Sequence, residues 1–380
     1  MKQDKLMLKD LGANLGRGLK LIRMLNFDSK VEIGPVRVEI ATASVCNYQC
    51  CFCHSHSYVR NNSGPYEIMT GEAVHNIITA LKKLKVKELL FSGNGEPLLC
   101  QGLAREIKEN GRYFKIEILT NGSSLATVDE ELFRNLAYLT ISLNSGDGST
   151  HRMTHGYKGQ NQFPTIVSHI ERILKYPRAA DKIKLNYVIT TDNIGELDDF
   201  FKKAIAWDVT FMARPVSVDF PELMPKELTR EMLQLVSEKA HGYLKTGKLT
   251  GKISLSFQLL ARACDLALNK ITNQQPELSR HLYPCYMSYI QPYISANGDV
   301  LLCCDGAEKP LGNINRESFL AIWQNKDKVA VRVACTRMNL TQKPPFKSCV
   351  DCANVLYHSA TFHSIYSKIP ILPGRLFPKK

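Results

Sequence analysis

The feature that most limits the fold of this chain is a repeated alternation of strand-like and helix-like segments. Short runs rich in Val, Ile, Leu and Phe are each followed by a stretch with apolar residues at helical spacing, such as residues 71–84 and 196–206. Strands that alternate with helices form a parallel sheet with right-handed crossovers. The predicted strands are Val36–Thr42, Lys87–Gly93, Lys115–Asn121, Tyr138–Asn144, Lys182–Thr190 and Val209–Val216.

This alternation predicts an α/β fold, specifically a partial (β/α)6 barrel of the TIM type. An open doubly wound sheet has the same alternation, but the polar motifs described below fall at the C-terminal ends of the strands, where barrels carry their chemistry. Beyond the last strand the sequence first becomes mostly helical. It then changes to short strand signals with Gly, Pro and cysteine, which predicts a small module stabilised by a bound metal centre. We expect a basic N-terminal extension over 1–35, the barrel over 36–225, a helical connection over 226–280, the cysteine-rich module over 281–356 and a C-terminal tail over 357–380.

Cysteine content and charge limit the compartment and the partners. Twelve cysteines in a sequence without a secretory signal indicate metal ligands or catalytic thiols in the cytoplasm rather than a disulfide scaffold. The net charge of +13 favours anionic partners, but the absence of long Lys/Arg runs leaves no nucleic-acid partner expected. No segment is apolar enough to cross a membrane, and the basic amphipathic pattern of residues 8–26 suits only weak peripheral membrane contact.

The first cysteine group follows directly after the first predicted strand. Cys46, Cys50 and Cys53 have the spacing C-x3-C-x2-C, and Cys51 lies between them. Three thiolates on one loop can hold three irons of a cubane cluster and leave the fourth iron open to a small molecule. A closed zinc site needs a fourth donor, which His54 or His56 would supply. The spacing alone therefore leaves iron and zinc open.

The sequence around these cysteines resembles the radical S-adenosylmethionine (SAM) superfamily. The family signature, C-x3-C-x-aromatic-C after a first barrel strand, matches the segment from Cys46 to Cys53. Ser92-Gly93-Asn94-Gly95-Glu96-Pro97 is similar to the family's G-G-E-P motif, and Ile141–Asn144 resembles its ribose-contacting segment.

The resemblance implies that Cys46, Cys50 and Cys53 bind a [4Fe–4S] cluster whose open iron chelates SAM. Cys51 is then not a ligand, and Phe52 lies by the adenine. The Glu96 carboxylate would accept a hydrogen bond from the SAM ammonium group. The SAM-binding residues implied by the resemblance are Phe52, Gly93, Asn94, Gly95, Glu96, Ser142 and Asn144.

A second cysteine group lies near the C-terminus and consists of Cys285, Cys303, Cys349 and Cys352. Four thiolates satisfy either an iron–sulfur cluster or a structural zinc, so spacing alone does not choose between them. The pattern C-x12-G-x4-C followed by C-x2-C resembles the twitch and SPASM modules of some radical SAM enzymes. The resemblance implies a second, auxiliary [4Fe–4S] cluster, and the shorter twitch form fits better because no cysteine follows Cys352.

The expected chemistry also comes from this resemblance. A 5′-deoxyadenosyl radical would abstract hydrogen from an unactivated C–H bond, and we expect dehydrogenation of a secondary alcohol of a sugar or aminocyclitol-like metabolite. A reductase, flavodoxin or ferredoxin would supply electrons. Arg214, at the end of the sixth strand, is the expected contact for an anionic or hydroxylated small-molecule substrate.

Three alternatives remain open at this stage. One is epimerisation of a sugar or peptide residue, with Cys335, Cys304 or Cys264 as the hydrogen donor and Cys335 as the catalytic candidate. Another is maturation of a ribosomal peptide. The last is a zinc-stabilised nucleic-acid-binding protein, which the ordered strand-end motifs disfavour.

Overall fold

The computed structural model describes residues 34–53, 67–157, 159–216, 221–272, 287–304 and 310–336, together with Cys285 and Cys349. Most of the predicted N-terminal extension, the tail over 357–380 and Cys352 lie outside the described residues. The chain divides into two compact units. One unit contains Thr42–Gly71 and Phe91–Gln274, and the other contains Met1–Ala41, Glu72–Leu90 and Gln275–Lys380.

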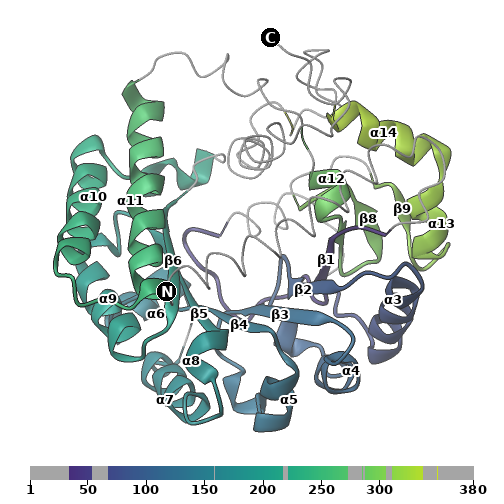
Figure 1. Cartoon of the computed structure of the whole chain (residues 1–380), viewed down its shortest axis with the longest axis horizontal. Coiled ribbons are helices and arrows are strands. Elements are labelled where there is room, and N and C mark those ends of the chain that lie inside the picture. Colours follow the sequence, from purple (N-terminus) through teal and green to yellow (C-terminus); the bar gives the residue numbers. More distant parts are fainter. Residues whose placement is uncertain are drawn as a thin grey trace. The chain divides into compact units, whose positions relative to one another are not determined.

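The strands within the described residues hydrogen-bond in the order β6-β5-β4-β3-β2-β1-β7-β8-β9 (Figure 1). The first six agree with the predicted strands within two residues at every end, so the predicted α/β class is confirmed. The domain boundaries at residues 225 and 280 stay predictions. The strands are β1 Arg37–Ala41, β2 Glu88–Ser92, β3 Lys115–Thr120, β4 Tyr138–Ser142, β5 Ile183–Ile189, β6 Thr210–Pro215, β7 Tyr293–Ile294, β8 Asp299–Leu301 and β9 Gly312–Asn313.

Helices connect the strands and follow them. Several begin at a residue whose side chain accepts the first free backbone N–H groups, as Asp147 does for α6 and Thr229 for α10. The α-helices are α3 Gly71–Lys83, α4 Leu103–Asn110, α5 Glu130–Asn135, α6 Gly148–His155, α7 Phe163–Ile173, α8 Ala179–Lys182, α9 Leu197–Ala206, α10 Arg230–Lys245, α11 Gly251–Thr272, α12 Met287–Ile290, α13 Phe319–Gln324 and α14 Lys326–Thr336. The 3-10 helices are η1 Pro97–Leu99, η2 Leu125–Thr127, η3 Ile194–Glu196 and η4 Pro221–Lys226.

In the unit that contains β3 to β6, these four strands pair in parallel. The two faces of β6 differ sharply. Phe211 packs against the rings of Phe201 and Phe257, with centroids 5.2 and 4.9 Å away, and all three rings are buried. Met212 and Arg214 project to the opposite face and are exposed. Alternation along the strand therefore separates an aromatic core from an open, partly polar face.

The end of β4 differs from the sequence prediction. The strand was expected to continue to Asn144, but it ends at Ser142. Asn144 has a φ of +49°, which lies in the left-handed region and interrupts the extended backbone. The strand therefore turns at the point where its polar residues begin.

In the other unit, β1 pairs in parallel with β7, and β7, β8 and β9 pair antiparallel. Gly298 has a φ of +87° in the hairpin between β7 and β8, a conformation that glycine adopts without strain. Behind these strands, α13 buries Phe319 and Trp323. Among the described residues, no helix has the length and apolar character needed to span a bilayer.

Candidate active site

The cysteines of the first group lie on one loop and are half-buried. The backbone N–H of Cys53 donates to the carbonyl of Cys50 at 3.1 Å, which closes a tight turn between two of the predicted ligands. Burial raises the pKa of the Cys46 and Cys50 thiols, and each is raised further by neighbouring cysteines of the loop. The three thiols therefore lie close together. Because their surroundings are partly buried, ionised thiolates there need a cationic partner.

Three thiolates on one loop match three irons of a cubane cluster and leave its fourth iron open. Cys46, Cys50 and Cys53 stay the predicted ligands of such a cluster.

The C-terminus of α6 holds the cysteine loop through its backbone. The N–H of Gln49 donates to the carbonyl of His155 at 2.9 Å, and the N–H of Cys51 donates to that of Thr154 at 2.8 Å. Gly156 ends the helix in the left-handed conformation, with a φ of +58°, and a Cβ there would lie 2.4 Å from the Gln49 carbonyl oxygen. Only glycine therefore permits this close approach.

Aromatic rings fill the space between the loop and α6. The rings of His151 and His155 stack with centroids 4.0 Å apart, and Tyr48 stacks on Tyr157 at 4.9 Å. The ring of Phe52 meets His155 edge-on at 5.8 Å. Burial lowers the pKa of His151 to about 2 and that of His155 to about 4, so both imidazoles are neutral.

This buried pair predicts acid sensitivity. A histidine whose folded pKa is depressed stabilises the fold above its unfolded pKa of 6.5, and that stability is lost as the pH falls toward the folded value. His151→Phe keeps an aromatic ring but removes one such group. In the metal-free protein, the free energy of unfolding from urea titrations should fall between pH 7.5 and pH 5 by about 2 kcal/mol more in the wild type than in the variant. Equal losses would contradict the prediction.

Glu96 is almost completely buried at the end of β2, and its carboxylate already accepts three hydrogen bonds. The donors are the Thr120 hydroxyl at 2.7 Å, the backbone N–H of Asn121 at 2.7 Å and that of Leu98 at 3.1 Å. Burial raises the pKa of Glu96, and these hydrogen bonds oppose the rise. A carboxylate has about four lone-pair positions, so one remains for the ammonium group that sequence reasoning assigned to it.

Asn121 is a site residue that the sequence prediction missed. While its backbone donates to Glu96, its side-chain Nδ2 lies 3.5 Å from the Cys46 sulfur and donates to Asn47 Oδ1 at 2.8 Å. It therefore links the predicted SAM-binding carboxylate to a predicted cluster ligand. Its position at the end of the third strand, like the other strand-end polar residues, was the available signal.

Gly95 lets the turn after β2 pack directly on the cysteine loop. A Cβ at this position would lie 2.2 Å from the Val45 carbonyl oxygen and 2.6 Å from that of Ala43. Backbone atoms cannot move aside as flexible side chains do, so Gly95→Ala should destabilise the fold by about 1–3 kcal/mol in urea titrations. Gly195→Ala is a matched control, because no atom lies within 4 Å of its added Cβ. Equal stability of the two variants would refute the role assigned to this contact.

The remaining predicted strand-end residues divide into two groups. Asn144 is buried and its side chain is engaged, with Oδ1 accepting from Val188 N at 2.8 Å and Nδ2 lying 3.4 Å from His155 Nε2. Ser142 is half-buried and pairs in register with Asn186, while Arg214 is exposed opposite Val188. Ser142, Asn186 and Arg214 therefore share one face of the sheet. The buried Asn186 Oδ1 accepts no hydrogen bond from the described residues, which leaves an acceptor available on that face.

A carboxylate lies beside the cysteine loop on the segment after β5. Asp192 Oδ2 accepts from the Cys51 thiol at 3.5 Å and forms a salt bridge with Lys226. The salt bridge raises the pKa of Lys226, while burial raises the pKa of Cys51 to about 11. At neutral pH, Cys51 is therefore a protonated thiol that donates to a carboxylate.

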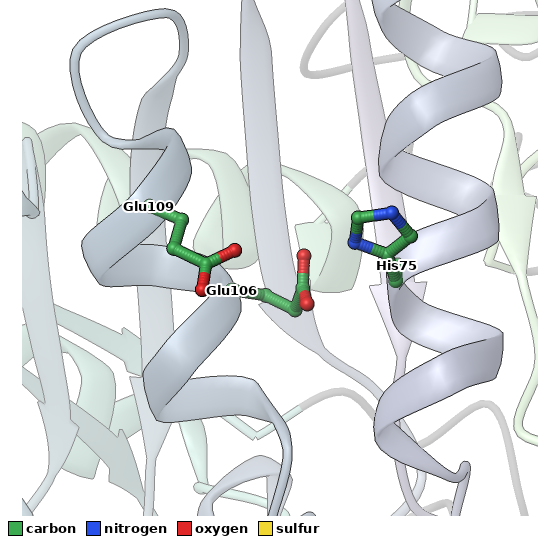
Figure 2. A group of neighbouring side chains, drawn as sticks. All are labelled: His75, Glu106 and Glu109. Atoms are coloured by element: carbon green, nitrogen blue, oxygen red, sulfur yellow. The ribbon is translucent and has the colours of Figure 1, made fainter.

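Not every buried carboxylate in this unit belongs to the site. Glu106 and Glu109 project from α4, as Figure 2 shows. The Glu106 carboxylate accepts from Arg105 at 3.2 Å and from Asn110 at 3.3 Å, within its own helix. These contacts hold the Glu106 carboxylate against its own helix.

In the other unit, three cysteines gather around the end of α14. The backbone N–H of Cys285 donates to the carbonyl of Cys335 at 3.1 Å. Cys335 is buried, and its thiol pKa is raised first by burial and then by Cys285 and Cys349. Cys303, also a predicted ligand, is half-buried after β8, while Cys304 is exposed. The structure thus places Cys335, the predicted catalytic thiol, among C-terminal cysteines, and its catalytic role stays a prediction.

Comparison with known families matches two parts of the chain. Residues 40–204 match the model of the radical SAM superfamily, and residues 285–353 match that of an iron–sulfur cluster-binding domain named SPASM. Members of these families hold a [4Fe–4S] cluster with SAM and auxiliary iron–sulfur clusters, respectively.

Individual relatives are more distant. A probable GTP 3′,8-cyclase of Archaeoglobus fulgidus is 30% identical over 176 residues, which cover 46% of this chain and 56% of that protein. An S-adenosylmethionine-dependent nucleotide dehydratase of Selenomonas ruminantium is 28% identical over 168 residues, or 42% of this chain and 58% of that protein. The chain thus spans little more than half the length of these relatives.

Among solved structures, SuiB of Streptococcus suis bound to S-adenosylmethionine is similar in fold. Its TM-score is 0.56 at 16% identity, over 83% of this chain and 77% of that chain. At this identity the likeness concerns the fold alone, and it agrees with the predicted partial barrel. Together with the motifs, the two family matches identify a radical SAM enzyme with a C-terminal SPASM-type iron–sulfur domain.

Proposed function

We propose that this chain oxidises a secondary alcohol on the sugar part of an anionic small molecule. The observation that carries the proposal is the open face of β4 to β6, where Ser142, Asn186 and Arg214 lie in the same unit as the cysteine loop. When bound, the cofactors supply a 5′-deoxyadenosyl radical to take a hydrogen atom and an auxiliary cluster to take one electron.

Within this proposal, the chain's own residues hold the cofactors. Cys46, Cys50 and Cys53 ligate the SAM-binding cluster, and Cys285, Cys303, Cys349 and Cys352 ligate the auxiliary cluster. The free lone pair of Glu96 receives the SAM ammonium group. Asn121 contacts both the Glu96 carboxylate and the Cys46 sulfur, and so fixes their relative position. A flavodoxin, ferredoxin or reductase supplies the electron for each cleavage of SAM.

The substrate class follows from the chemistry of the open face. The Arg214 guanidinium suits a phosphate or carboxylate, and Asn186 Oδ1 accepts from a hydroxyl group. The relatives from Archaeoglobus and Selenomonas are named for GTP and for a nucleotide, which are anionic and contain a hydroxylated sugar. These names support an anionic sugar derivative as the substrate class here.

The oxidation requires a group that accepts the hydroxyl proton. The substrate H–C–O–H unit becomes C=O by losing one hydrogen atom from carbon, one proton from oxygen and one electron. Asp192 is the carboxylate beside the cysteine loop, and it forms a salt bridge with Lys226. We assign the proton to Asp192.

The test compares the wild type with Asp192→Asn, using SAM, a strong reductant and a panel of nucleotides and sugar phosphates in deuterated buffer. The wild type should form a ketone two hydrogens lighter than one substrate of the panel. The variant should still cleave SAM but lose most of the ketone, and Asp181→Asn, an exposed α8 control, should behave as the wild type. Ketone formation by Asp192→Asn at the wild-type rate would refute the assignment.

Epimerisation is the second candidate, and one observation favours it. The Cys51 thiol carries an exchangeable proton beside the cysteine loop, whereas Cys264, an earlier candidate donor, is fully buried on α11. In the same experiment, recovery of substrate with one solvent deuterium on carbon, lost in Cys51→Ala, would establish epimerisation and overturn the oxidation proposal.

A further inference from the structure

An arginine on α14 is completely buried in the unit that contains the C-terminal cysteines. Arg332 has 0% of its surface exposed and is among the largest fully buried side chains. It precedes Cys335 by three residues on the same helix, so the two side chains project from neighbouring turns of one helix face. A guanidinium is rarely buried without a partner that offsets the loss of hydration.

The contacts of Arg332 account for only part of its hydrogen-bonding capacity. Its guanidinium lies over the Trp323 ring, 4.1 Å from the centroid, and 5.7 Å from the Tyr289 ring. Nη2 donates to the Trp323 carbonyl. Nε and Nη1 are buried, and within the described part of the chain they make no hydrogen bond. Their N–H donors are therefore free on the helix that carries Cys335.

The charge of Arg332 is equally uncompensated. Burial lowers the pKa of the guanidinium to about 10, so it stays charged at neutral pH. No salt bridge to a carboxylate is formed by this side chain in the described residues. Its electrostatic neighbours are Tyr289, whose side chain also hydrogen-bonds to the guanidinium, and the Cys335 thiol, which in turn neighbours Cys285 and Cys349. Burying an unpaired charge is costly, whereas a cluster held by thiolates is anionic and has sulfur acceptors.

We propose that Arg332 is a positioning residue of the auxiliary cluster site, donating its free N–H groups to cluster sulfur atoms and raising the cluster's reduction potential. This rests on the proposed assignment of an auxiliary cluster to the C-terminal cysteines. A fixed positive charge stabilises the more negative, reduced state, and hydrogen bonds to the sulfurs act in the same direction. Arg332 would thus make the cluster a better electron acceptor.

The test isolates the auxiliary cluster in the full-length chain by using the Cys46→Ala, Cys50→Ala, Cys53→Ala background. Metal analysis comes first: zinc in place of iron there overturns the cluster assignment itself, independently of Arg332. With iron present, a redox titration monitored by electron paramagnetic resonance compares the background protein with its Arg332→Met variant. Methionine keeps the aliphatic packing on Trp323. Lys326→Met removes an exposed charge from the same helix and serves as the control.

Arg332→Met should reduce the reduced-to-oxidised ratio of the cluster at a fixed potential by tenfold or more, which corresponds to about 59 mV for one electron. Arg332→Lys keeps the charge and should change this ratio less, while Lys326→Met should leave the ratio unchanged. An unchanged ratio in a cluster-containing Arg332→Met protein would overturn the proposal.

A second measurement does not require any Arg332 variant to retain its cluster. The background protein is labelled with ¹⁵N-arginine, and the reduced cluster is examined for magnetic coupling to arginine nitrogen. Coupling supports a guanidinium in contact with cluster sulfur. Its absence from a cluster-containing protein would overturn the proposal, even if every Arg332 variant failed to fold.

Discussion

Replacing Cys46, Cys50 and Cys53 together with alanine should abolish reductive cleavage of SAM. In the proposed ligation each thiolate holds one iron of the cluster, so the loop without its sulfurs would retain no site where SAM can be chelated and reduced. Iron content after anaerobic reconstitution should fall by about four per chain, and 5′-deoxyadenosine should drop to the level without enzyme. Chromatography of 5′-deoxyadenosine and iron analysis measure the two effects.

Cys51→Ala is the matched control for this experiment. Its sulfur lies in the same loop but donates to Asp192, and the backbone N–H that anchors it to α6 is kept by alanine. The control should retain both iron and SAM cleavage. If the triple variant still forms 5′-deoxyadenosine, or if Cys51→Ala loses the cluster as completely, the assignment of ligands is wrong.

Removal of the four C-terminal thiols should separate SAM cleavage from substrate oxidation. With Cys285, Cys303, Cys349 and Cys352 replaced by alanine, the protein should lose about four irons per chain and still form 5′-deoxyadenosine. The ketone should fall to background, because the substrate radical has no acceptor for its remaining electron. Product analysis by mass spectrometry, alongside 5′-deoxyadenosine, measures this separation.

Two outcomes would contradict this prediction. A folded variant with one cluster that still makes the ketone would show that the auxiliary cluster is not the acceptor. Wild-type protein containing about four irons and one zinc, rather than about eight irons, would show that the C-terminal site is structural. The metal count of the wild type does not depend on whether the variant folds.

Local pattern was sufficient to predict the first six strands of this fold. The six βα repeats have apolar runs bounded by polar or glycine residues, and tertiary contacts shift their ends by at most two residues. The exception at β4 arises from Asn144, whose left-handed backbone is fixed by contacts to β5 and α6. Such contacts join segments far apart in sequence, so a local pattern does not report them.

Residue type and spacing were enough to predict roles for the cysteine loop and Glu96, and these roles stay predictions. Asn121 was missed because its role depends on meeting Glu96 and Cys46 across long sequence separations. Arg332 was missed for a different reason. On α14 it lies among other charged residues, and only packing distinguishes its buried side chain from an exposed one such as Lys326. Burial of a charge is a property of the folded chain and not of its sequence pattern.

The two faces of β6 also bear on how this enzyme can change its substrate during evolution. Phe211 and its aromatic neighbours fix the strand, whereas Met212, 50% exposed, and Arg214 occupy the other face. Mutations at these two positions alter size and charge where a substrate would lie and leave the buried rings in place. Under the proposed function, natural variation or a laboratory library randomised at Met212 and Arg214 would therefore change the substrate with little loss of fold stability.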